Sequence, residues 1–223
     1  MHGLSPCIRP VHSSEMTGRR AGTDPRERSN RLVVVVTGTS GAGKGTLERV
    51  LLQRMLDVFE LAVSATTRER RPSEEHGREY YFLSEREFDR LVEDDEFLEY
   101  VELPWGARSG TLRSEIDRIQ AHGKVPLLDL ETDGALRVQE TIPGSVTIFV
   151  DAPTFEELER RLRERATESS GEIRVRLELA RKQQQQKDRF DYLIVNDDVE
   201  RAADELEAIV RKELQAAATM SRP

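Results

Sequence analysis

The feature that most constrains the fold is a glycine-rich segment that directly follows a short apolar run. Residues 32–36 are apolar throughout, and residues 38–44 read Gly-Thr-Ser-Gly-Ala-Gly-Lys before a helical pattern begins. Glycines allow the backbone to turn successive N–H groups toward one anion, and the start of a helix adds positive charge. Lys44 supplies a point charge for the phosphate that is transferred. The segment therefore predicts a loop that binds a nucleoside triphosphate.

The predicted ligands of the triphosphate follow from this loop. They are Gly38, Ser40, Gly41, Ala42, Gly43, Lys44, Gly45 and Thr46. In the general pattern a hydroxyl residue follows the lysine and binds Mg²⁺, whereas here Gly45 takes that place and Thr46 comes one residue later. We therefore expect Mg²⁺ to be held mainly by the phosphates and water, without a direct protein ligand. Asp129, at the end of a predicted strand, is expected to reach that water.

Further apolar runs predict a parallel sheet. They occupy residues 61–63, 125–128, 146–150 and 192–195. Continuous apolarity, unlike alternation, is typical of strands that are buried on both faces. Helical patterns lie between these runs: residues 154–157 (Thr-Phe-Glu-Glu) form a capping-box pattern, and residues 197–200 begin a last amphipathic helix. This alternation predicts an α/β fold with a five-stranded parallel sheet flanked by helices.

Three parts of the chain do not share this alternation. Residues 1–30 contain several prolines and no apolar periodicity, so they are predicted to be a disordered tail, with a transit peptide as the alternative. Residues 65–112 are polar and charged and are predicted to be an insert between core elements. Residues 216–223 are predicted to be a flexible C-terminus.

Charge and composition exclude several functional classes. The chain has 42 acidic and 34 basic residues, the opposite of the balance that nucleic-acid binding usually requires, so no nucleic-acid partner is expected. The longest apolar run, residues 32–36, falls far short of the roughly 18 residues of a membrane span. A single cysteine excludes an intrachain disulfide and a zinc site built on several cysteines. With no secretory segment visible, we expect a cytoplasmic protein.

A cluster of arginines begins where the second predicted strand ends. Arg68, Arg70 and Arg71 stand within four positions of an otherwise acidic chain. Because the guanidinium group is a planar fork that matches phosphate oxygens, the cluster predicts an anion clamp. A solvated charged loop would have the same composition, so these residues alone leave both interpretations open.

From about residue 31 to 215 the sequence resembles the guanylate kinases, which phosphorylate GMP with ATP. The resemblance rests on residues 64–71 (Ser-Ala-Thr-Thr-Arg-Glu-Arg-Arg), Glu74, Gly77 and residues 79–82 (Glu-Tyr-Tyr-Phe), and it continues through residues 96–100, 110–111, 190–192 and 196–198. It implies a P-loop kinase core at residues 31–64, 113–155 and 178–215. It also implies a small mixed α/β insert at 65–112 that binds the acceptor, and a helical lid at 156–177.

The resemblance further implies an acceptor site for GMP or dGMP. Arg68, Arg71 and Tyr80 would hold the monophosphate, while Ser64, Glu99 and Thr111 would read the guanine edge. The other implied residues of this site are Glu74, Ser109, Gly110, Asp129 and Glu131. The chemistry is consistent, because guanine donates from N1–H and its amine to a carboxylate such as Glu99 and accepts at O6 from Ser64. Adenine reverses this pattern and would leave a buried carboxylate unpaired.

Two stretches depart from the family pattern. Guanylate kinases usually carry Tyr-Tyr-Gly before the Ser or Thr that contacts the base, and Ser109 stands here in place of the phosphate-contacting tyrosine. The neighbouring Arg108 is the candidate to compensate for the lost hydroxyl. The family's Asp-x-Asp-x-Gln-Gly also changes, so that Glu131 is longer by a methylene and Asp133 replaces an amide. These changes concern base recognition and leave the phosphate chemistry intact.

The lid is rich in arginine. By resemblance, Arg161, Arg165 and Arg176 reach the triphosphate, and Arg165 and Arg176 act with Lys44 as catalytic residues. The remaining arginines, Arg160, Arg163 and Arg174, are expected to form ion pairs on a charged helix. The glutamine run at residues 183–186 is expected to be an exposed helix face.

The reaction implied is in-line transfer of a phosphoryl group from ATP to the acceptor. The acceptor oxygen is already anionic, so no general base is needed, and catalysis consists of positioning and charge neutralisation by Lys44, the arginines and Mg²⁺. One alternative is a kinase of the same fold that acts on another phosphorylated acceptor. A second is a non-catalytic guanylate-kinase-like interaction module, which the complete phosphate loop argues against. The oligomeric state, monomer or homodimer, stays open.

Overall fold

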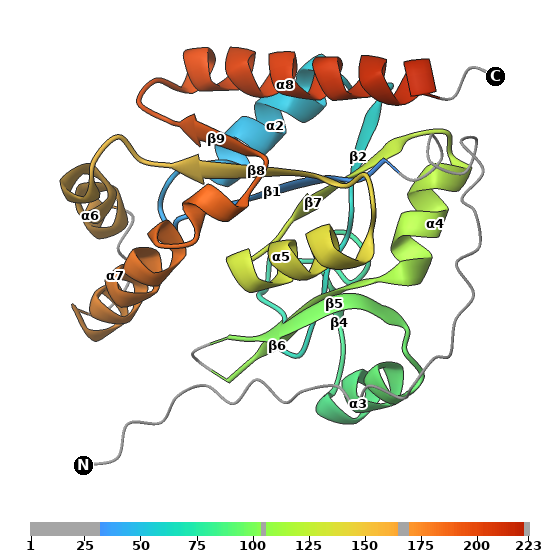
Figure 1. Ribbon diagram of the computed structural model, residues 1–223. Coiled ribbons are helices and arrows are strands. Elements are labelled where there is room, and N and C mark those ends of the chain that lie inside the picture. Colours follow the sequence, from blue (N-terminus) through green and yellow to red (C-terminus); the bar gives the residue numbers. More distant parts are fainter. Residues whose placement is uncertain (1–31, 104–105, 165–169, 221–223) are drawn as a thin grey trace.

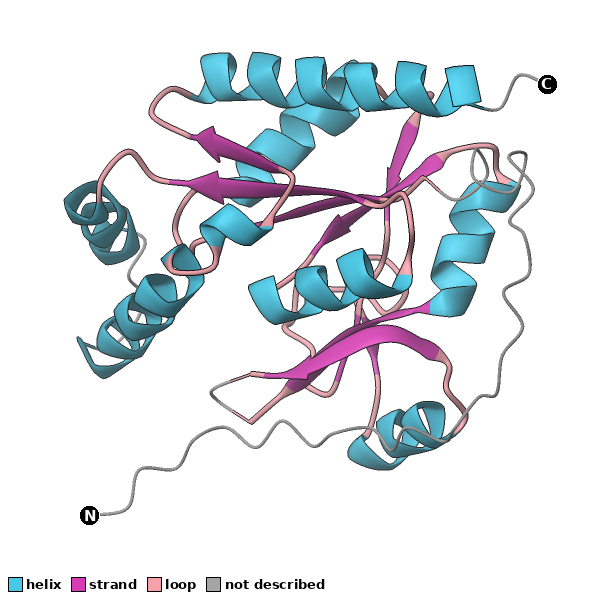
Figure 2. Cartoon of the chain, in the orientation of Figure 1, coloured by secondary structure: helices cyan, strands magenta, loops and turns pink. Residues whose placement is uncertain are grey.

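The computed structural model describes residues 32–103, 106–164 and 170–220, which form two sheets with helices packed around them (Figures 1 and 2). The larger sheet has five parallel strands in the order β2-β7-β1-β8-β9. Its strands are β1 (Val34–Gly38), β2 (Phe59–Leu61), β7 (Val125–Asp129), β8 (Val146–Asp151) and β9 (Tyr192–Val195). Each of the five apolar runs contributes to this sheet, and the predicted fold class is confirmed.

The central strand β1 explains why its apolar run is continuous. Val34 and Val36 belong to the hydrophobic cluster that includes side chains of α2 (Lys44–Arg54) and α8 (Val199–Met220). Val33 and Val35 belong to a second cluster with side chains of α4 (Arg113–Ala121) and α5 (Thr132–Thr141). Successive side chains of a strand point to opposite faces, so helices on both faces require apolar residues at every position.

Residues 65–112 form the smaller sheet, which is mixed. Its strands are β3 (Ala65–Thr66), β4 (Tyr81–Phe82), β5 (Phe97–Glu102) and β6 (Arg108–Leu112), in the order β4-β3-β6-β5. Helix α3 (Glu85–Glu93) covers it through Phe88, whose ring stacks on that of Phe97 with 4.4 Å between centroids. This sheet lies beside α5 and apart from the strands of the larger sheet (Figure 1).

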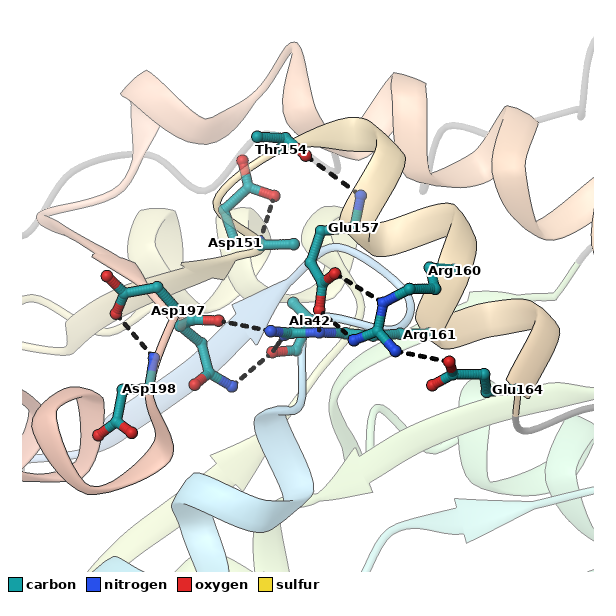
Figure 3. Close-up of polar contacts among 11 residues, drawn as sticks. Ala42, Asp151, Thr154, Glu157, Arg160, Arg161, Glu164, Asp197 and Asp198 are labelled. Atoms are coloured by element: carbon teal, nitrogen blue, oxygen red, sulfur yellow. Dashed lines mark hydrogen bonds and ion pairs between the residues drawn. The ribbon is translucent and has the colours of Figure 1, made fainter.

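The segment predicted as a lid contains α6 (Phe155–Glu164) and the start of α7 (Ser170–Gln184), which continues past residue 177 and is followed by the short helix η1 (Lys187–Arg189). The N–H of Glu157 donates to Thr154 Oγ1 at 3.1 Å (Figure 3). The reciprocal half of the predicted capping box is wrong. The Glu157 carboxylate binds Arg160 and Arg161 instead, because two guanidinium groups one turn away compete successfully with one backbone N–H.

Two predicted boundaries shift. Strand β2 ends at Leu61, where the predicted run begins, although the N–H of Ala62 still donates to Leu127 O at 2.9 Å. Helix α8 continues to Met220, so residues 216–220 of the predicted C-terminal segment are helical. Leu214 and Ala217 pack against the core and extend the helix. The predicted tail at residues 1–30 lies outside the described residues. No helix in the described ranges is long and apolar enough to cross a membrane.

Candidate active site

The glycine-rich loop connects β1 to α2, as predicted. Gly38, Gly41 and Gly43 have positive φ values of 144°, 92° and 92°, a region that side chains disfavour. The loop is also tightly packed, because a Cβ on Gly38 would lie 2.0 Å from Val150 O. The Lys44 ammonium donates to Gly38 O at 3.3 Å, so it folds back over the loop. The loop is thus built for close approach of an anion to the backbone.

Two side chains from distant elements form hydrogen bonds to the backbone of the loop. Asn196, which is buried just after β9, donates from Nδ2 to Ala42 O at 2.7 Å. Arg161 of α6 donates to Asn196 O at 3.0 Å and to Ala42 O at 3.5 Å, while its Nε binds Glu157 at 2.7 Å (Figure 3). Arg161 therefore lies at the loop where it was predicted, and its contacts here are with the backbone carbonyls. The sequence motif contained Asn196 but gave it no role.

One carboxyl group beneath the loop was not predicted. Glu48 lies one helical turn beyond Lys44, is only 4% exposed, and its Oε1 has no hydrogen-bond partner among the described residues. Burial and the nearby Asp129 raise the pKa of Glu48 to about 8, although Lys44 opposes the rise. The sequence signal that could have indicated a buried Glu48 is its place between Leu47 and Leu51 on the same helix, both of which are fully buried.

The arginine cluster lies between β3 and β4 of the second sheet. Arg68 binds both carboxylate oxygens of Glu74, at 2.9 and 3.0 Å, and its guanidinium lies 5.3 Å from the centroid of the Tyr80 ring. The backbone N–H of Arg71 donates to Glu74 at 2.9 Å, while the Arg71 side chain is 71% exposed. Arg68 holds the pKa of Glu74 below its usual value. The structure brings these four predicted residues together.

One residue of the larger sheet acts electrostatically on this cluster. Burial raises the pKa of the Tyr80 hydroxyl, and the charge of Asp129 raises it further while Arg68 lowers it. Asp129 is the last residue of β7 and has an exposed carboxylate. The field of Asp129 therefore acts on both Glu48 beneath the loop and Tyr80 of the arginine cluster.

The predicted guanine-reading pair is buried between β5 and β6. Glu99 and Thr111 face each other in register, and Glu99 is 3% exposed. Neither Glu99 Oε1 nor Thr111 Oγ1 has a hydrogen-bond partner within the described ranges. Burial raises the pKa of Glu99 to about 7, although the polar groups of Thr111 next to the carboxyl group and the charge of Arg137 lower it. Gly134 makes room for the carboxylate, because a Cβ there would lie 2.5 Å from Glu99 Oε2.

The remaining acceptor residues occupy the surrounding strands. Ser64 precedes β3, and its carbonyl accepts from the N–H of Tyr81 at 2.9 Å. Gly110 of β6 permits close packing of β5, since a Cβ would lie 2.5 Å from Glu99 O. Ser109 Oγ donates to Ala65 O at 3.2 Å and so stabilises the pairing of β6 with β3.

Arg108 does not compensate for the missing tyrosine. It binds Asp89 at 2.7 Å and Glu85 at 2.5 Å, and it lies 4.4 Å from the centroid of the Phe88 ring. The reason is the alternation of a strand: neighbouring residues of β6 point to opposite faces, so Arg108 faces α3 while Ser109 does not. The prediction for Arg108 was therefore wrong.

The glutamine run at the end of α7 is not an exposed face, which corrects a further prediction. Gln183 is 2% exposed, and its Nε2 donates to Glu131 Oε2 at 2.7 Å. Gln186 donates to Asp133 at 3.2 Å. Burial raises the pKa of Glu131, and Lys44 lowers it. Glu131 and Asp133, the two residues that depart from the family pattern, thus each accept a hydrogen bond from a glutamine of this run.

The lid arginines divide into three groups. Arg160 pairs with Glu157 and Glu164, and Arg163 pairs with Glu159, which confirms their predicted ion pairs. Arg176 lies on α7. Arg165 lies outside the described residues, so its predicted role is not addressed by the structure.

A parallel sheet with a glycine-rich phosphate loop after its central strand, and a second sheet that carries arginines and a buried carboxyl group, defines a P-loop kinase of small phosphorylated acceptors. Sequence comparison specifies the family. A sequence model of the guanylate kinase family matches residues 29–213, and the chain belongs to the guanylate kinase family.

Individual relatives agree with this assignment. The chain is 44% identical over 187 residues to a guanylate kinase of Synechococcus sp. (strain JA-3-3Ab), covering 83% of this chain and 85% of the relative. It is 42% identical over 174 residues to a guanylate kinase of Chlamydia felis (strain Fe/C-56), covering 78% and 84%. The crystal structure of guanylate kinase from Anaplasma phagocytophilum matches with a TM-score of 0.66 at 30% identity, covering 82% of this chain and 86% of that one.

Proposed function

We propose that this protein transfers the terminal phosphoryl group of ATP to GMP, and to dGMP, giving ADP and the nucleoside diphosphate. The observation that carries the proposal is the buried pair of Glu99 and Thr111, which has unpartnered polar atoms within the described part of the chain. A buried polar atom without a partner costs free energy unless a ligand satisfies it. The N1–H and exocyclic amine of guanine are the donors that a carboxylate requires.

The acceptor phosphate has a matching partner on the same sheet. Arg68 and Arg71 supply fixed positive charge, and the ring of Tyr80 packs against the Arg68 guanidinium. Arg68 already binds both carboxylate oxygens of Glu74, whereas the guanidinium fork of Arg71 is exposed. Because such a fork matches two phosphate oxygens at once, Arg71 orients the acceptor as well as attracting it. Base and phosphate are then held at separate points, which fixes the attacking oxygen relative to the donor.

Catalysis at the donor side is assigned to the loop, Lys44 and the lid arginines. Backbone N–H groups and Lys44 meet charge on the phosphoryl oxygens, where a positioned donor is worth about 3–4 kcal/mol or more in the transition state. We propose that three lid residues add positive charge near the same phosphoryl oxygens, namely Arg161, Arg165 and Arg176. The acceptor oxygen needs no general base, because a phosphate monoester is anionic near neutral pH.

Mg²⁺ is proposed to accompany ATP and to neutralise charge between its phosphates. Among the described residues no group of three or more His, Cys, Asp or Glu side chains could hold a metal ion. We propose that the ion is held mainly by the phosphates and water, since Mg²⁺ usually keeps several of its waters. Asp129, with its exposed carboxylate at the end of β7, would bind one of those waters.

The proposal is tested by supplying the purified protein with Mg-ATP and, separately, GMP, dGMP, IMP and AMP, and measuring ADP formation. We expect turnover with GMP and dGMP, weaker turnover with IMP because it lacks the amine, and very little with AMP. Equal use of GMP, IMP and AMP would contradict the guanine assignment. ADP formation that needs none of the four would contradict transfer to a nucleotide.

A further inference from the structure

Gln183 joins three parts of the chain, namely the end of α7, the phosphate loop and the residue that precedes α5. It lies in the last turn of α7 and is 2% exposed. Its Oε1 accepts from the N–H of Ser40 in the phosphate loop at 2.9 Å. Its Nε2 donates to Oε2 of Glu131, the residue that precedes α5, at 2.7 Å. One amide thus connects the donor loop to the element that carries Glu131.

The neighbouring glutamines also hold this end of α7 in place through hydrogen bonds. Gln184 donates to both carboxylate oxygens of Asp151, at 3.1 and 3.2 Å, and Asp151 also accepts from the Thr39 hydroxyl of the loop at 2.9 Å. Gln186 donates to Asp133 on α5 at 3.2 Å. The end of α7 therefore contacts both sides of the site through amides, and Gln183 is the only one of the three that touches both sides itself.

The chemistry at Gln183 allows only one orientation of the amide. Ser40 offers an N–H, which can only donate, and Glu131 as a carboxylate can only accept. A buried amide with a donor at one end and an acceptor at the other fixes the separation of its two partners, because a shift of either breaks a hydrogen bond in a site where water cannot replace it.

We propose that Gln183 is a positioning residue that sets the phosphate loop and Glu131 relative to each other, and thereby aligns the ATP and GMP sites for in-line transfer. This proposal rests on the proposed kinase activity. Gln183 is given no contact with either substrate. Its effect is therefore expected in kcat, since misplacement of reacting groups by about 1 Å costs roughly 100-fold in rate.

The test uses a reciprocal exchange of the two side chains. Gln183→Glu places two carboxylates at hydrogen-bond distance, and we expect kcat to fall by about 10- to 100-fold, with the KM values for ATP and GMP changed less than about threefold. Adding Glu131→Gln restores the geometry, because the new carboxylate accepts from Ser40 N–H and from the new amide. We expect the double variant to regain at least about tenfold of the lost kcat.

The matched control is Gln185→Glu, the same change at an exposed position of the same run, which should leave kcat unchanged. Gln183→Met, which keeps the size but removes both hydrogen bonds, serves if Gln183→Glu fails to fold. Titration with a non-hydrolysable ATP analogue counts the folded sites. A double variant no better than Gln183→Glu, or a Gln183→Met variant with the kcat of the control, would overturn the proposal. Absence of GMP phosphorylation by the wild-type protein would instead overturn the proposed function.

Discussion

The phosphate loop after β1 is held mainly by its backbone geometry and by side chains of distant elements that bind its backbone, whereas the acceptor site on the second sheet buries a carboxyl group opposite a hydroxyl group. In the loop, the carbonyl of Ala42 accepts from Asn196, and Ser40 N–H is bound by Gln183. On the second sheet, Glu99 and Thr111 are buried, and Glu99 Oε1 and Thr111 Oγ1 have no hydrogen-bond partner among the described residues.

This difference has a physical consequence for the two substrates. A preformed loop binds any triphosphate that fits its N–H groups, so it selects the phosphates and little else. In the acceptor site, buried polar groups without partners raise the free energy of the empty site. The base that forms hydrogen bonds with these groups therefore binds much more tightly than other bases. Substitutions in one region should therefore leave the kinetics of the other substrate nearly unchanged.

The largest effect is expected at Lys44. Replacing Lys44 by Ala removes a charge that meets the transferred phosphoryl group, and kcat should fall by about 1,000-fold or more. The melting temperature should change much less than kcat, because Lys44 makes a long hydrogen bond to Gly38 O and otherwise interacts with nearby carboxyl groups only through its charge. Steady-state kinetics and thermal unfolding measure both. Lys212→Ala, at an exposed position of α8, is the control, and near-wild-type turnover in the Lys44 variant would refute the loop assignment.

The second effect isolates base recognition. Glu99→Gln replaces an acceptor by a donor that cannot meet both guanine donors, and loss of a charge-assisted bond costs roughly 1.5–3 kcal/mol, with more for the mismatch. The kcat/KM for GMP should therefore fall by about 10- to 1000-fold, while the KM for ATP holds. A parallel loss of ATP affinity would show that the two regions are not separate.

The third effect isolates the acceptor phosphate. Arg68→Ala and Arg71→Ala should each raise the KM for GMP by about 10- to 100-fold and leave that for ATP nearly unchanged, with only partial rescue by Lys. Arg70→Ala is the control, since Arg70 is an exposed neighbour in the same cluster that binds the Glu74 carbonyl. If the affinity for ATP fell instead, the assignment of the donor and acceptor sites would be the wrong way round.

The smallest effect concerns Glu48, a buried carboxyl group on the donor side whose Oε1 has no hydrogen-bond partner among the described residues. Because the pKa of Glu48 is about 8 in the folded protein, its contribution to stability is present at acidic pH and is lost as pH rises toward 8. Glu48→Gln cannot ionise, so its melting temperature should exceed that of the wild type by at least about 3 °C at pH 8 and by little at pH 5. The exposed Glu93→Gln variant should show no such dependence, and an equal shift at both pH values would contradict a buried ionisation.

The two regions were not equally predictable from the sequence. The loop is a local pattern, in which glycines, a preceding strand and a following helix are all adjacent in the chain, so its location follows from the residues themselves. The acceptor residues came from resemblance, and their partners came only from the structure. Nothing near Gln183 in the sequence indicates Glu131, because hydrogen bonds between distant elements depend on the packing of α7 against the loop.

The failed predictions have specific physical causes. Arg108 was assigned by adjacency to Ser109, which ignores that adjacent residues of a strand face opposite ways. The glutamine run was interpreted by composition, although Ala180 and Gln183 are one helical turn apart and are buried together. Residue type alone did not show that a polar helix face would be covered by the phosphate loop and α5.

The most direct test of the separation between the two regions is the KM for GMP as a function of pH, measured for the wild type and for Glu99→Gln at saturating ATP. Glu99 accepts from guanine only as a carboxylate, and burial places its pKa at about 7. Below that pH the wild-type KM should rise by about tenfold per unit relative to the variant, in which titration of the GMP phosphate is the same. The account predicts this divergence below about pH 7, with a KM for ATP that is the same in both proteins. Parallel pH profiles for GMP in the two proteins would contradict it.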